Sequence, residues 1–582
     1  MAKSYQEIRP SQFITTFGPG SIVETPGGPV VLKAMDTLFT AIDRQPAEFE
    51  IIDERLSKGK LGDARITRIP TNAELRLPTD EPIYPTYMFP EWGLCAQHRG
   101  HQVLYQASEG CPECMTPTVW QRREKAGREA IRFVTACEAG HLDEVPWAKL
   151  AHPDRKPCGT RHYLWHGGGR ALRLVRIECP KCRIPVNFGQ AYGREWKCWA
   201  RQPELGGAPD SSALQCQNPA RIVQRGSANL RMSELETALT ILDMPARLHD
   251  ILAGRSLLGR LETLSDEDLL DHKRVVSAAK KAKLSDDSIA YLEQTSWRAI
   301  EHAIGQLLGP DREGPSSLQD AELEHLRNAA TYGAPASPQA QWLGSPPLFE
   351  VKQADVRTVP GPVGNLTFRV VPISRLRMVM VQTGYRRLAP DTGKVVSTAF
   401  ERNGGSWYPG VELYGEGIFI DLVDIPLALT GSRATVWKAR YEAALSADLV
   451  LHPTHVWWHS LSHRLLWALS VDSGYSSAAI RERVYVRVED GEVTASGLLL
   501  YTVQPGGDGT LGGMISLVNR FGRVLERALQ DVATCSNDPL CEEASTGGAE
   551  GAACYSCLFA SETSCEHRNH GLDRLLITDN LP

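Results

Sequence analysis

The 582-residue chain contains no run of about 18 apolar residues, the length that a helix needs to cross a bilayer. Its first ten residues lack the apolar core of a secretory signal. We therefore expect a cytoplasmic protein without membrane contacts, in which the 14 cysteines stay reduced. In such a compartment, paired Cys-x-x-Cys spacings favour zinc binding over disulfides.

The sequence also lacks the Gly-Lys-Ser/Thr ending of a phosphate-binding loop. The glycine-rich stretches at residues 18–20 and 506–513 have no lysine at the required position. ATP hydrolysis uses that lysine to reach the β- and γ-phosphates, so we predict a chain without ATPase activity. The stretch 9–23 is expected to be extended chain with a Gly-Pro-Gly turn.

Acidic residues outnumber basic ones, and the net charge of −6 argues against a protein that coats nucleic acid. Between residues 91 and 231 the balance reverses, with 21 Lys and Arg against 13 Asp and Glu. A local basic excess suits phosphate contacts, although an ordinary solvated face explains it equally well. Trp196 and Trp199 stand beside basic residues and could stack on bases, but they could equally pack around a metal site. The candidate DNA contacts are Arg170, Arg173, Arg176, Trp196, Lys197 and Arg201.

Length and changes of pattern predict a mixed α+β fold with several domains. We expect a β-rich segment (1–90), a cysteine-rich basic region with zinc knuckles (91–231), a helical insertion (232–331) and a linker (332–363). A second β-rich segment (364–450) follows, in which Gly415-Glu416-Gly417 is expected to turn before a strand. Residues 451–582 are predicted to form a mixed-sheet domain that ends in a cysteine cluster.

Knuckle-like spacings in the cysteine-rich region predict tetrahedral zinc sites, because each bend places two ligands on one side of the backbone. One predicted site consists of Cys95, His98, Cys111 and Cys114. A second consists of Cys179 and Cys182, completed by Cys198 and Cys216. Cys137, His141, His152 and Cys158 are candidates for a third. The alternative for any one of these cysteines is a small buried side chain.

The last cysteine cluster predicts a further zinc site. Cys554, Cys557 and Cys565 are close enough in sequence to supply three ligands. The fourth is Cys541 or Cys535, and we favour Cys541 because it is nearer, with His567 as an outside candidate. Together the spacings predict at least two and up to three zinc ions.

Three histidines precede this cluster at helical spacing. His455, His459 and His463 stand at i, i+4 and i+8, and thus on one face of a helix. Zinc proteases with two such histidines carry a glutamate directly after the first, but here Val456 and Ser460 stand at those positions. We favour buried, hydrogen-bonded histidines. The alternative is a metal-dependent nuclease or hydrolase that uses the three histidines with Glu482.

Several motifs together resemble the DrmB family, whose members are partners of the DrmA helicase in DISARM anti-phage systems. The matching stretches are Arg9-Pro-Ser-Gln…Thr16-Phe-Gly-Pro-Gly-Ser-Ile-Val, Cys137…Gly140-His141-Leu-Asp-Glu-Val-Pro-Trp147, Arg225-Gly-Ser-Ala-Asn229 and Gly415-Glu-Gly-Ile-Phe-Ile. The C-terminal part is similar to the uncharacterised domain that ends MrfA-type DNA-repair helicases. Its motifs are Glu482-Arg-Val-Tyr485, Leu511-Gly-Gly513, Asp538-Pro-Leu-Cys541 and Ser561-Glu-Thr-Ser-Cys565.

The resemblance implies an accessory subunit without ATPase activity that forms a heterodimer with a DrmA-like helicase. Such a subunit would help the helicase engage DNA, single-stranded or duplex with an overhang, through backbone contacts. Family likeness does not fix the chemistry of a site. The hydrolase above and a purely structural scaffold are therefore the competing hypotheses.

Overall fold

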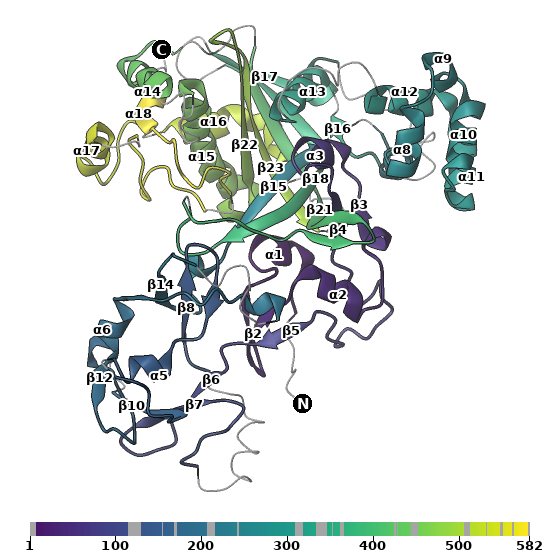
Figure 1. Ribbon diagram of the computed structural model, residues 1–582. Helices are drawn as coiled ribbons and strands as arrows, with labels where there is room; N and C mark the ends of the chain where they lie inside the picture. Colours follow the sequence, from purple (N-terminus) through teal and green to yellow (C-terminus); the bar gives the residue numbers. More distant parts are fainter. Residues whose placement is uncertain are drawn as a thin grey trace. The chain divides into compact units, whose positions relative to one another are not determined.

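The structure is a computed structural model, and it divides into two compact units that are described separately (Figure 1). Unit 1 consists of Met1–Ile51, Lys60–Thr237 and Met380–Val411, and unit 2 of Ile52–Gly59, Ala238–Val379 and Glu412–Pro582. The boundary falls inside two long strands, β18 (Thr367–Arg386) and β21 (Gly405–Leu422). The structure describes residues 7–114, 130–153, 155–167, 171–206, 216–240, 242, 244–308, 318–332, 346–351, 353–360, 366–390, 392–423, 427, 429–443, 452–505, 513–530, 532–547, 551–561 and 564–579.

Unit 1 begins with a helix where we expected extended chain. Helix α1 (Pro10–Thr15) has Pro10 at its first position, where a missing backbone N–H costs nothing. The predicted turn follows, with Gly18 and Gly20 both at positive φ. A three-stranded antiparallel sheet comes next, in the order β1 (Ile22–Thr25), β2 (Gly28–Leu32), β5 (Thr86–Met88). Further elements here are α2 (Met35–Ala41), β3 (Glu50–Ile51) and β4 (Arg65–Arg68).

Two small sheets carry the cysteine-rich region of unit 1. The first has the order β12 (Pro185–Asn187), β11 (Arg176–Glu178), β10 (His162–His166), β7 (Gln102–Gln106), β6 (Trp92–Cys95). The second has the order β13 (Glu195–Trp196), β14 (Ala220–Gln224), β8 (Phe133–Cys137), β9 (Leu142–Asp143). Their shared core is aromatic, and the Phe133 and Phe188 rings lie 4.8 Å apart. Short helices α5 (Trp147–Leu150) and α6 (Phe188–Tyr192) contribute to this core.

Unit 2 is built on an antiparallel sheet in which β21 pairs with β23 (Glu492–Pro505) and β23 with β22 (Arg481–Glu489). Gly415, Glu416 and Gly417 lie inside β21, not in the turn that we expected. A side chain at Gly415 would collide with the Thr502 carbonyl of β23. The glycines therefore permit a close approach of two strands.

Helices cover one face of this sheet. Helix α15 (Pro453–Ser473) packs against β22, β23 and α16 (Phe521–Leu529), as Figure 1 shows. Trp457 and Leu461 of α15 are buried with Leu500 of β23 and Val524 of α16. Burial of a large apolar side chain contributes about 1.5–3 kcal/mol, so this layer fixes the position of α15. Pro453 occupies the first position of α15, and Gly474, at φ 79°, ends the helix.

The predicted helical insertion forms its own core within unit 2. Helix α12 (Trp297–Leu308) buries Ile300, Ala303, Ile304 and Leu307, the i, i+3, i+4, i+7 pattern of an amphipathic helix. It packs with α7 (Ala246–Leu252), α8 (Arg255–Leu261), α10 (His272–Lys281) and α11 (Asp286–Gln294). Helix α13 (Leu318–Tyr332) instead contacts β22. The mixed α+β, multidomain fold class is thus confirmed.

Ten other α-helices and strands lie in the described residues. They are α3 (Glu54–Gly59), α9 (Asp266–Leu269), α14 (Ser432–Ala443), α17 (Leu540–Gly547), α18 (Arg574–Asp579), β15 (Met232–Thr240), β16 (Glu350–Val351), β17 (Arg357–Pro360), β19 (Val396–Ser397) and β20 (Phe400–Arg402). Strands β16 and β17 lie in the stretch that we predicted to be a linker and pair with β18. Within the described residues, no helix is both long and apolar enough to cross a membrane.

Candidate metal centres

Five groups of side chains bring four metal-ligating atoms each to within 4.8 Å of one another. All 14 cysteines of the chain belong to these groups, so no cysteine is left over. Unit 1 holds Cys95/His98/Cys111/Cys114, Cys137/His141/Cys198/Cys216 and His152/Cys158/Cys179/Cys182. Unit 2 holds Cys535/Cys541/Cys554/Cys557 and His459/His463/Glu482/Cys565.

Sulfur–sulfur distances test whether zinc fits these groups. Neighbouring sulfurs are 3.4 Å apart for Cys158 and Cys179, and 3.8 Å apart for Cys541 and Cys557. Four thiolates around zinc at about 2.3 Å would have edges of about 3.8 Å, whereas a disulfide bond is only about 2.05 Å long. The groups therefore suit tetrahedral zinc. The prediction that the chain has zinc sites is confirmed. The structure offers five candidate sites, where we expected two or three.

The first group has the composition that the spacing predicted. Cys95 ends strand β6, and Cys111 and Cys114 form a knuckle in which the Cys114 N–H donates to the Cys111 carbonyl at 3.2 Å. The His98 Nε2 atom lies 3.2 Å from the Cys111 sulfur, and the Cys95 and Cys114 sulfurs are 3.8 Å apart. Three sulfurs and one imidazole nitrogen match a closed structural zinc site.

The other two groups of unit 1 correct the predicted pairing, because the knuckle Cys179/Cys182 does not join Cys198 and Cys216. Strand β14 pairs with β8, with Ala220 opposite Cys137, and β13 pairs with β14. The segments next to β13 and β14 therefore bring Cys198 and Cys216 to Cys137 and His141. The β10–β11 pairing, with Leu164 opposite Glu178, likewise brings Cys179 and Cys182 to Cys158 and His152.

Local interactions prepare these ligands for a metal. The Cys198 thiol, together with the His141 imidazole, lowers the pKa of Cys137 to about 4 although burial opposes this shift. The His152 ring makes a 2.7 Å hydrogen bond from Nδ1 to the Ala148 carbonyl, which directs Nε2 toward the Cys182 sulfur at 3.5 Å. A ring N–H held by a carbonyl fixes the tautomer of a metal-binding histidine.

In unit 2, the four-cysteine group uses both Cys535 and Cys541, where we expected one of them beside Cys565. Cys554 and Cys557 form a knuckle, with sulfurs 3.7 Å apart. Backbone N–H groups donate to the sulfurs, from Asn537 to Cys535 and from Ser556 to Cys554, each at 3.4 Å. Such donors stabilise thiolates.

Cys565 belongs instead to a fifth group, with His459 and His463 of α15 and Glu482 of β22. The Glu482 Oε1 atom lies 2.8 Å from His459 Nε2 and 3.1 Å from His463 Nε2. The Cys565 sulfur lies 3.2 Å from His459 Nε2. All four residues are buried. Burial opposes ionisation of Glu482, but the two imidazoles lower its pKa overall.

This group contains three residues of the hydrolase alternative, with Cys565 in place of His455. His455 lies beside the group, with its ring 5.8 Å from that of His459 and 4.7 Å from that of His567. The helical spacing predicted that the two histidines of α15 lie on one face. It did not indicate that they share a group with Cys565. That residue follows His459 by 106 positions.

The predicted DNA contacts divide into exposed and buried residues. Arg173, Arg176 and Lys197 are exposed, and the Lys197 ammonium lies 4.6 Å from the ring centre of the half-exposed Trp199. Trp196 is buried, and its indole N–H donates to the Ala191 carbonyl at 3.0 Å, so it cannot stack on a base.

The two other predicted contacts are Arg201 and Arg170. Arg201 forms a 2.8 Å ion pair with Asp143, and Arg170 lies outside the described residues.

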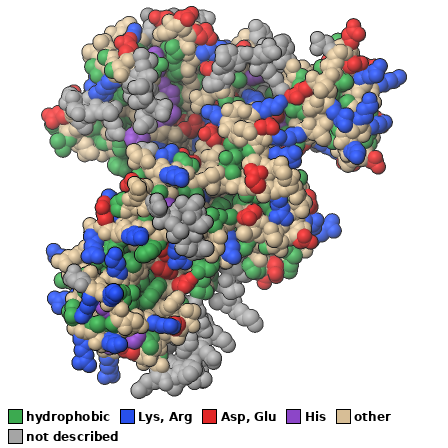
Figure 2. Space-filling model, in the orientation of Figure 1, with side chains coloured by type: hydrophobic (Ala, Val, Ile, Leu, Met, Phe, Trp, Pro, Cys, Tyr) green, Lys and Arg blue, Asp and Glu red, His purple; other side chains and the backbone are tan. Residues whose placement is uncertain are grey.

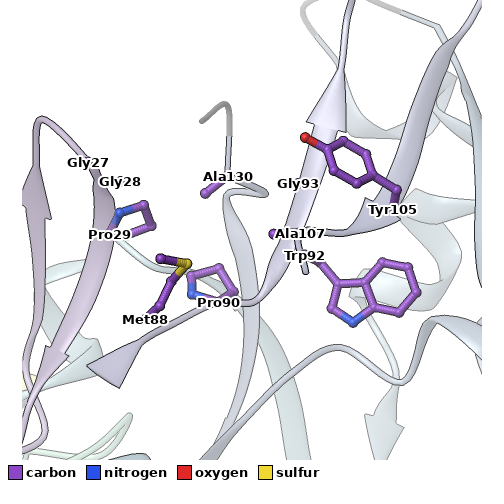
Figure 3. A pocket seen from close by; sticks show the side chains of 10 residues that line it. All are labelled: Gly27, Gly28, Pro29, Met88, Pro90, Trp92, Gly93, Tyr105, Ala107 and Ala130. Atoms are coloured by element: carbon purple, nitrogen blue, oxygen red, sulfur yellow. The ribbon is translucent and has the colours of Figure 1, made fainter. Parts of the chain in front are cut away.

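Unit 1 also has a small pocket between β2 and the β6–β7 hairpin (Figure 3). Its lining is mostly apolar, with Pro29, Met88, Pro90, Trp92 and Tyr105 around it. Among the described residues, no histidine, cysteine or charged side chain lines it. The described lining of this pocket thus offers no group for acid–base or metal chemistry.

Comparisons with known proteins place these groups in context. Residues 9–232 match the family model of a domain of unknown function (DUF8724), and residues 461–558 match the model of the MrfA Zn-binding domain. The DISARM protein DrmB of Bacillus paralicheniformis is 26% identical over 547 residues, which cover 85% of this chain and 89% of that protein.

A crystal structure of the DUF1998 helicase MrfA bound to DNA also matches, with 13% identity and a TM-score of 0.21. The match covers 40% of this chain but only 25% of the helicase, and at this TM-score it supports no conclusion about the fold. The sequence matches are more extensive. Over most of its length the chain is similar to the DISARM protein DrmB, and its C-terminal part is similar to the MrfA Zn-binding domain.

Proposed function

We propose that this chain is an accessory subunit, without ATPase activity, of a DISARM-like anti-phage complex in the cytoplasm. In that complex it binds a DrmA-like helicase and helps the helicase engage DNA. The observation that carries the proposal is the 26% identity to DrmB, because it extends over 547 residues and is not confined to one shared module. The match of residues 461–558 to the MrfA Zn-binding domain is a second, independent likeness that supports it.

In this proposal zinc is structural. The three groups of unit 1 and the four-cysteine group of unit 2 each offer four protein ligands, which leaves no position for a reacting water. Thiolate sites of this kind suit a compartment that keeps thiols reduced. Zinc would fold loop-rich segments that cannot bury enough apolar surface on their own.

The proposed DNA contacts lie on the cysteine-rich region of unit 1. Figure 2 shows many Lys and Arg side chains and few Asp and Glu side chains over the part that holds β10 and β12. Arg173 and Arg176 are exposed there, and Lys197 with Trp199 adds a cation beside an aromatic face. Phosphate contacts and stacking of this kind are independent of DNA sequence.

Co-purification with a DrmA-type helicase, followed by DNA binding at several salt concentrations, tests the proposal. We expect a stable complex that binds single-stranded or overhang DNA more tightly than the helicase alone. The affinity should fall as salt rises, since phosphate contacts release counterions. A chain that binds the helicase but leaves its DNA affinity unchanged would be a scaffold, and the DNA part of the proposal would be wrong.

The triple variant Arg173→Ala/Arg176→Ala/Lys197→Ala locates the surface. It should weaken binding of all sequences alike and lower the log–log salt slope by about 0.9 for each phosphate that the protein ceases to neutralise. Zinc content should stay constant, because none of the three is in a metal group. The matched control Lys273→Ala/Arg274→Ala/Lys281→Ala removes the same charge from exposed positions of α10. Equal slopes for the two triple variants would place the DNA-binding surface elsewhere.

A further inference from the structure

The His459/His463/Glu482/Cys565 group is separate from the four-cysteine group of the same unit. Cys535, Cys541, Cys554 and Cys557 all lie within the match to the MrfA Zn-binding domain, residues 461–558. His459 precedes that match and Cys565 follows it. His463 and Glu482 lie inside the match, so the match covers only two of the four donors of this second set.

The two imidazoles are oriented as metal ligands. The His459 ring bonds the Gly571 carbonyl through Nδ1 at 3.1 Å, and the His463 ring bonds the Leu558 carbonyl through Nδ1 at 2.8 Å. A carbonyl can only accept, so both Nδ1 atoms carry a proton, and in the neutral imidazole each Nε2 atom then has the lone pair. These lone pairs point at the Glu482 carboxylate and, from His459, at the Cys565 sulfur. With neutral imidazoles, the electron-rich atoms that converge here suit a cation between them.

The two anionic ligands are held as well. The Ser462 hydroxyl donates to Oε2 of Glu482, which leaves Oε1 to face the histidines. The Asn569 backbone N–H donates to the Cys565 sulfur at 3.2 Å. Each of the four candidate metal ligands thus has its own supporting hydrogen bond. Such bonds orient the ligands of protein metal sites.

Charge and burial select the type of ion. One carboxylate and one thiolate carry two negative charges, which a divalent cation neutralises in a site where all four residues are at most 5% exposed. Two imidazoles, a carboxylate and a thiolate form a mixed set of borderline donors that suits zinc at about 2.0–2.3 Å. A hydrolytic zinc site keeps one position for water, but here four buried side chains fill all four.

We propose that His459, His463, Glu482 and Cys565 bind one zinc ion in a closed structural site that joins α15, β22 and the segment before α18. This inference does not depend on the defence role. It assigns a structural purpose to the histidines that the hydrolase hypothesis would use. The ion would anchor Cys565, and with it residues 564–571, to the sheet of unit 2.

Zinc counting on the full-length chain by native mass spectrometry tests the proposal. The double variant His463→Gln/Cys565→Ala should contain one zinc ion fewer than the wild type. The matched control His455→Gln/His567→Gln changes two side chains beside the site that are not among its four donors, and it should keep every ion. Equal zinc content in the first variant and the wild type would overturn the proposal.

A second measurement needs no variant and so does not depend on how a variant folds. In ¹¹³Cd-substituted wild type, the chemical shift reports the number of sulfur ligands. The five groups predict one resonance for four sulfurs, three for three sulfurs and one nitrogen, and one for a single sulfur with nitrogen and oxygen. A spectrum without the single-sulfur resonance would overturn the proposal and leave the other four groups untouched.

Discussion

The second unit holds two metal groups that differ in donor chemistry, burial and span along the chain. The four-cysteine group lies within residues 535–557, and three of its residues are only partly buried. The His-Glu-Cys group draws on residues from 459 to 565, all of them buried. One short segment can assemble the first group around zinc, whereas the second needs helix α15 and strand β22 already packed. Zinc would therefore drive the folding of a loop in the first group. In the second group it would stabilise elements that are already packed.

One segment connects the two groups. The His463 ring bonds the carbonyl of Leu558, the residue after Cys557. The neighbouring Arg464 donates from Nη1 to the Cys557 carbonyl itself at 3.4 Å. The knuckle of the four-cysteine group therefore also orients a ligand of the other group. Loss of the first should disturb the second more than the reverse.

The largest expected effect comes from the double variant Cys554→Ser/Cys557→Ser. Structural zinc contributes on the order of 10 kcal/mol to folding, so the loop should unfold and the stability of unit 2 should fall. Zinc content should drop by one ion or, if the carbonyl at Leu558 moves, by two. Zinc analysis and thermal unfolding measure both quantities.

The control for this variant changes the two residues between the same cysteines, Tyr555→Ala/Ser556→Ala. The Tyr555 side chain is 90% exposed, so its loss removes little packing. Zinc content and unfolding temperature should stay close to the wild type. If the cysteine variant keeps its zinc and its unfolding temperature too, the knuckle is not a metal site.

A buried ion pair next to the His-Glu-Cys group should have the next largest effect. Glu322 of α13 is completely buried, and its carboxylate accepts from Arg483 at 2.9 Å and from Tyr485 at 3.0 Å. Glu322→Ala would take this carboxylate from the buried Arg483, which would keep its ion pair with Glu566. Breaking a buried pair from one side costs about 3–5 kcal/mol. Denaturant unfolding measures the loss.

The matched control is Glu324→Ala on the same helix, whose carboxylate pairs with Arg487 but is 60% exposed. Exposed pairs contribute less than about 1 kcal/mol. Because Arg483 follows Glu482 directly, the Glu322 variant also reports on the metal group. If its zinc count stays constant while stability falls, the metal site holds its geometry without the ion pair.

Sequence reasoning found the local features and missed the long-range ones, for physical reasons. A Cys-x-x-Cys bend fixes two ligands by itself, and the prediction of zinc chemistry rested on such bends. Strand pairing decides which bends share a metal, and the pairing of β14 with β8 is not visible in ligand spacing. The same limit explains Gly415, which looked like a turn residue because the neighbouring strand β23 was unknown.

Charge around the four-cysteine group gives the third prediction. Four thiolates around Zn²⁺ leave two negative charges, and Arg574 is buried beside them. Burial opposes its charged form, but Cys541 and Asp538 raise its pKa overall. Arg574→Met keeps the volume, leaves Asp538 without this partner, and should cost about 3 kcal/mol together with weaker zinc binding. Arg523→Met, at an exposed position of α16, is the control.

The smallest expected effect comes from Ser462→Ala, which removes the hydroxyl that donates to Glu482. Loss of such a supporting hydrogen bond lowers metal affinity by about tenfold or more, equal to about 1.4 kcal/mol. The fold should survive, because only one small polar group leaves the helix. Chelator competition on the full-length chain should release the ion of the His-Glu-Cys group earlier than in the wild type. Ser470→Ala on the same helix, whose hydroxyl donates to the Trp467 carbonyl at 2.8 Å, should release it as the wild type does. If Ser462→Ala and Ser470→Ala release zinc alike, the Ser462 hydrogen bond is not needed to orient Glu482 toward the metal. The His-Glu-Cys group would then depend less on the packed helix α15 than its geometry indicates.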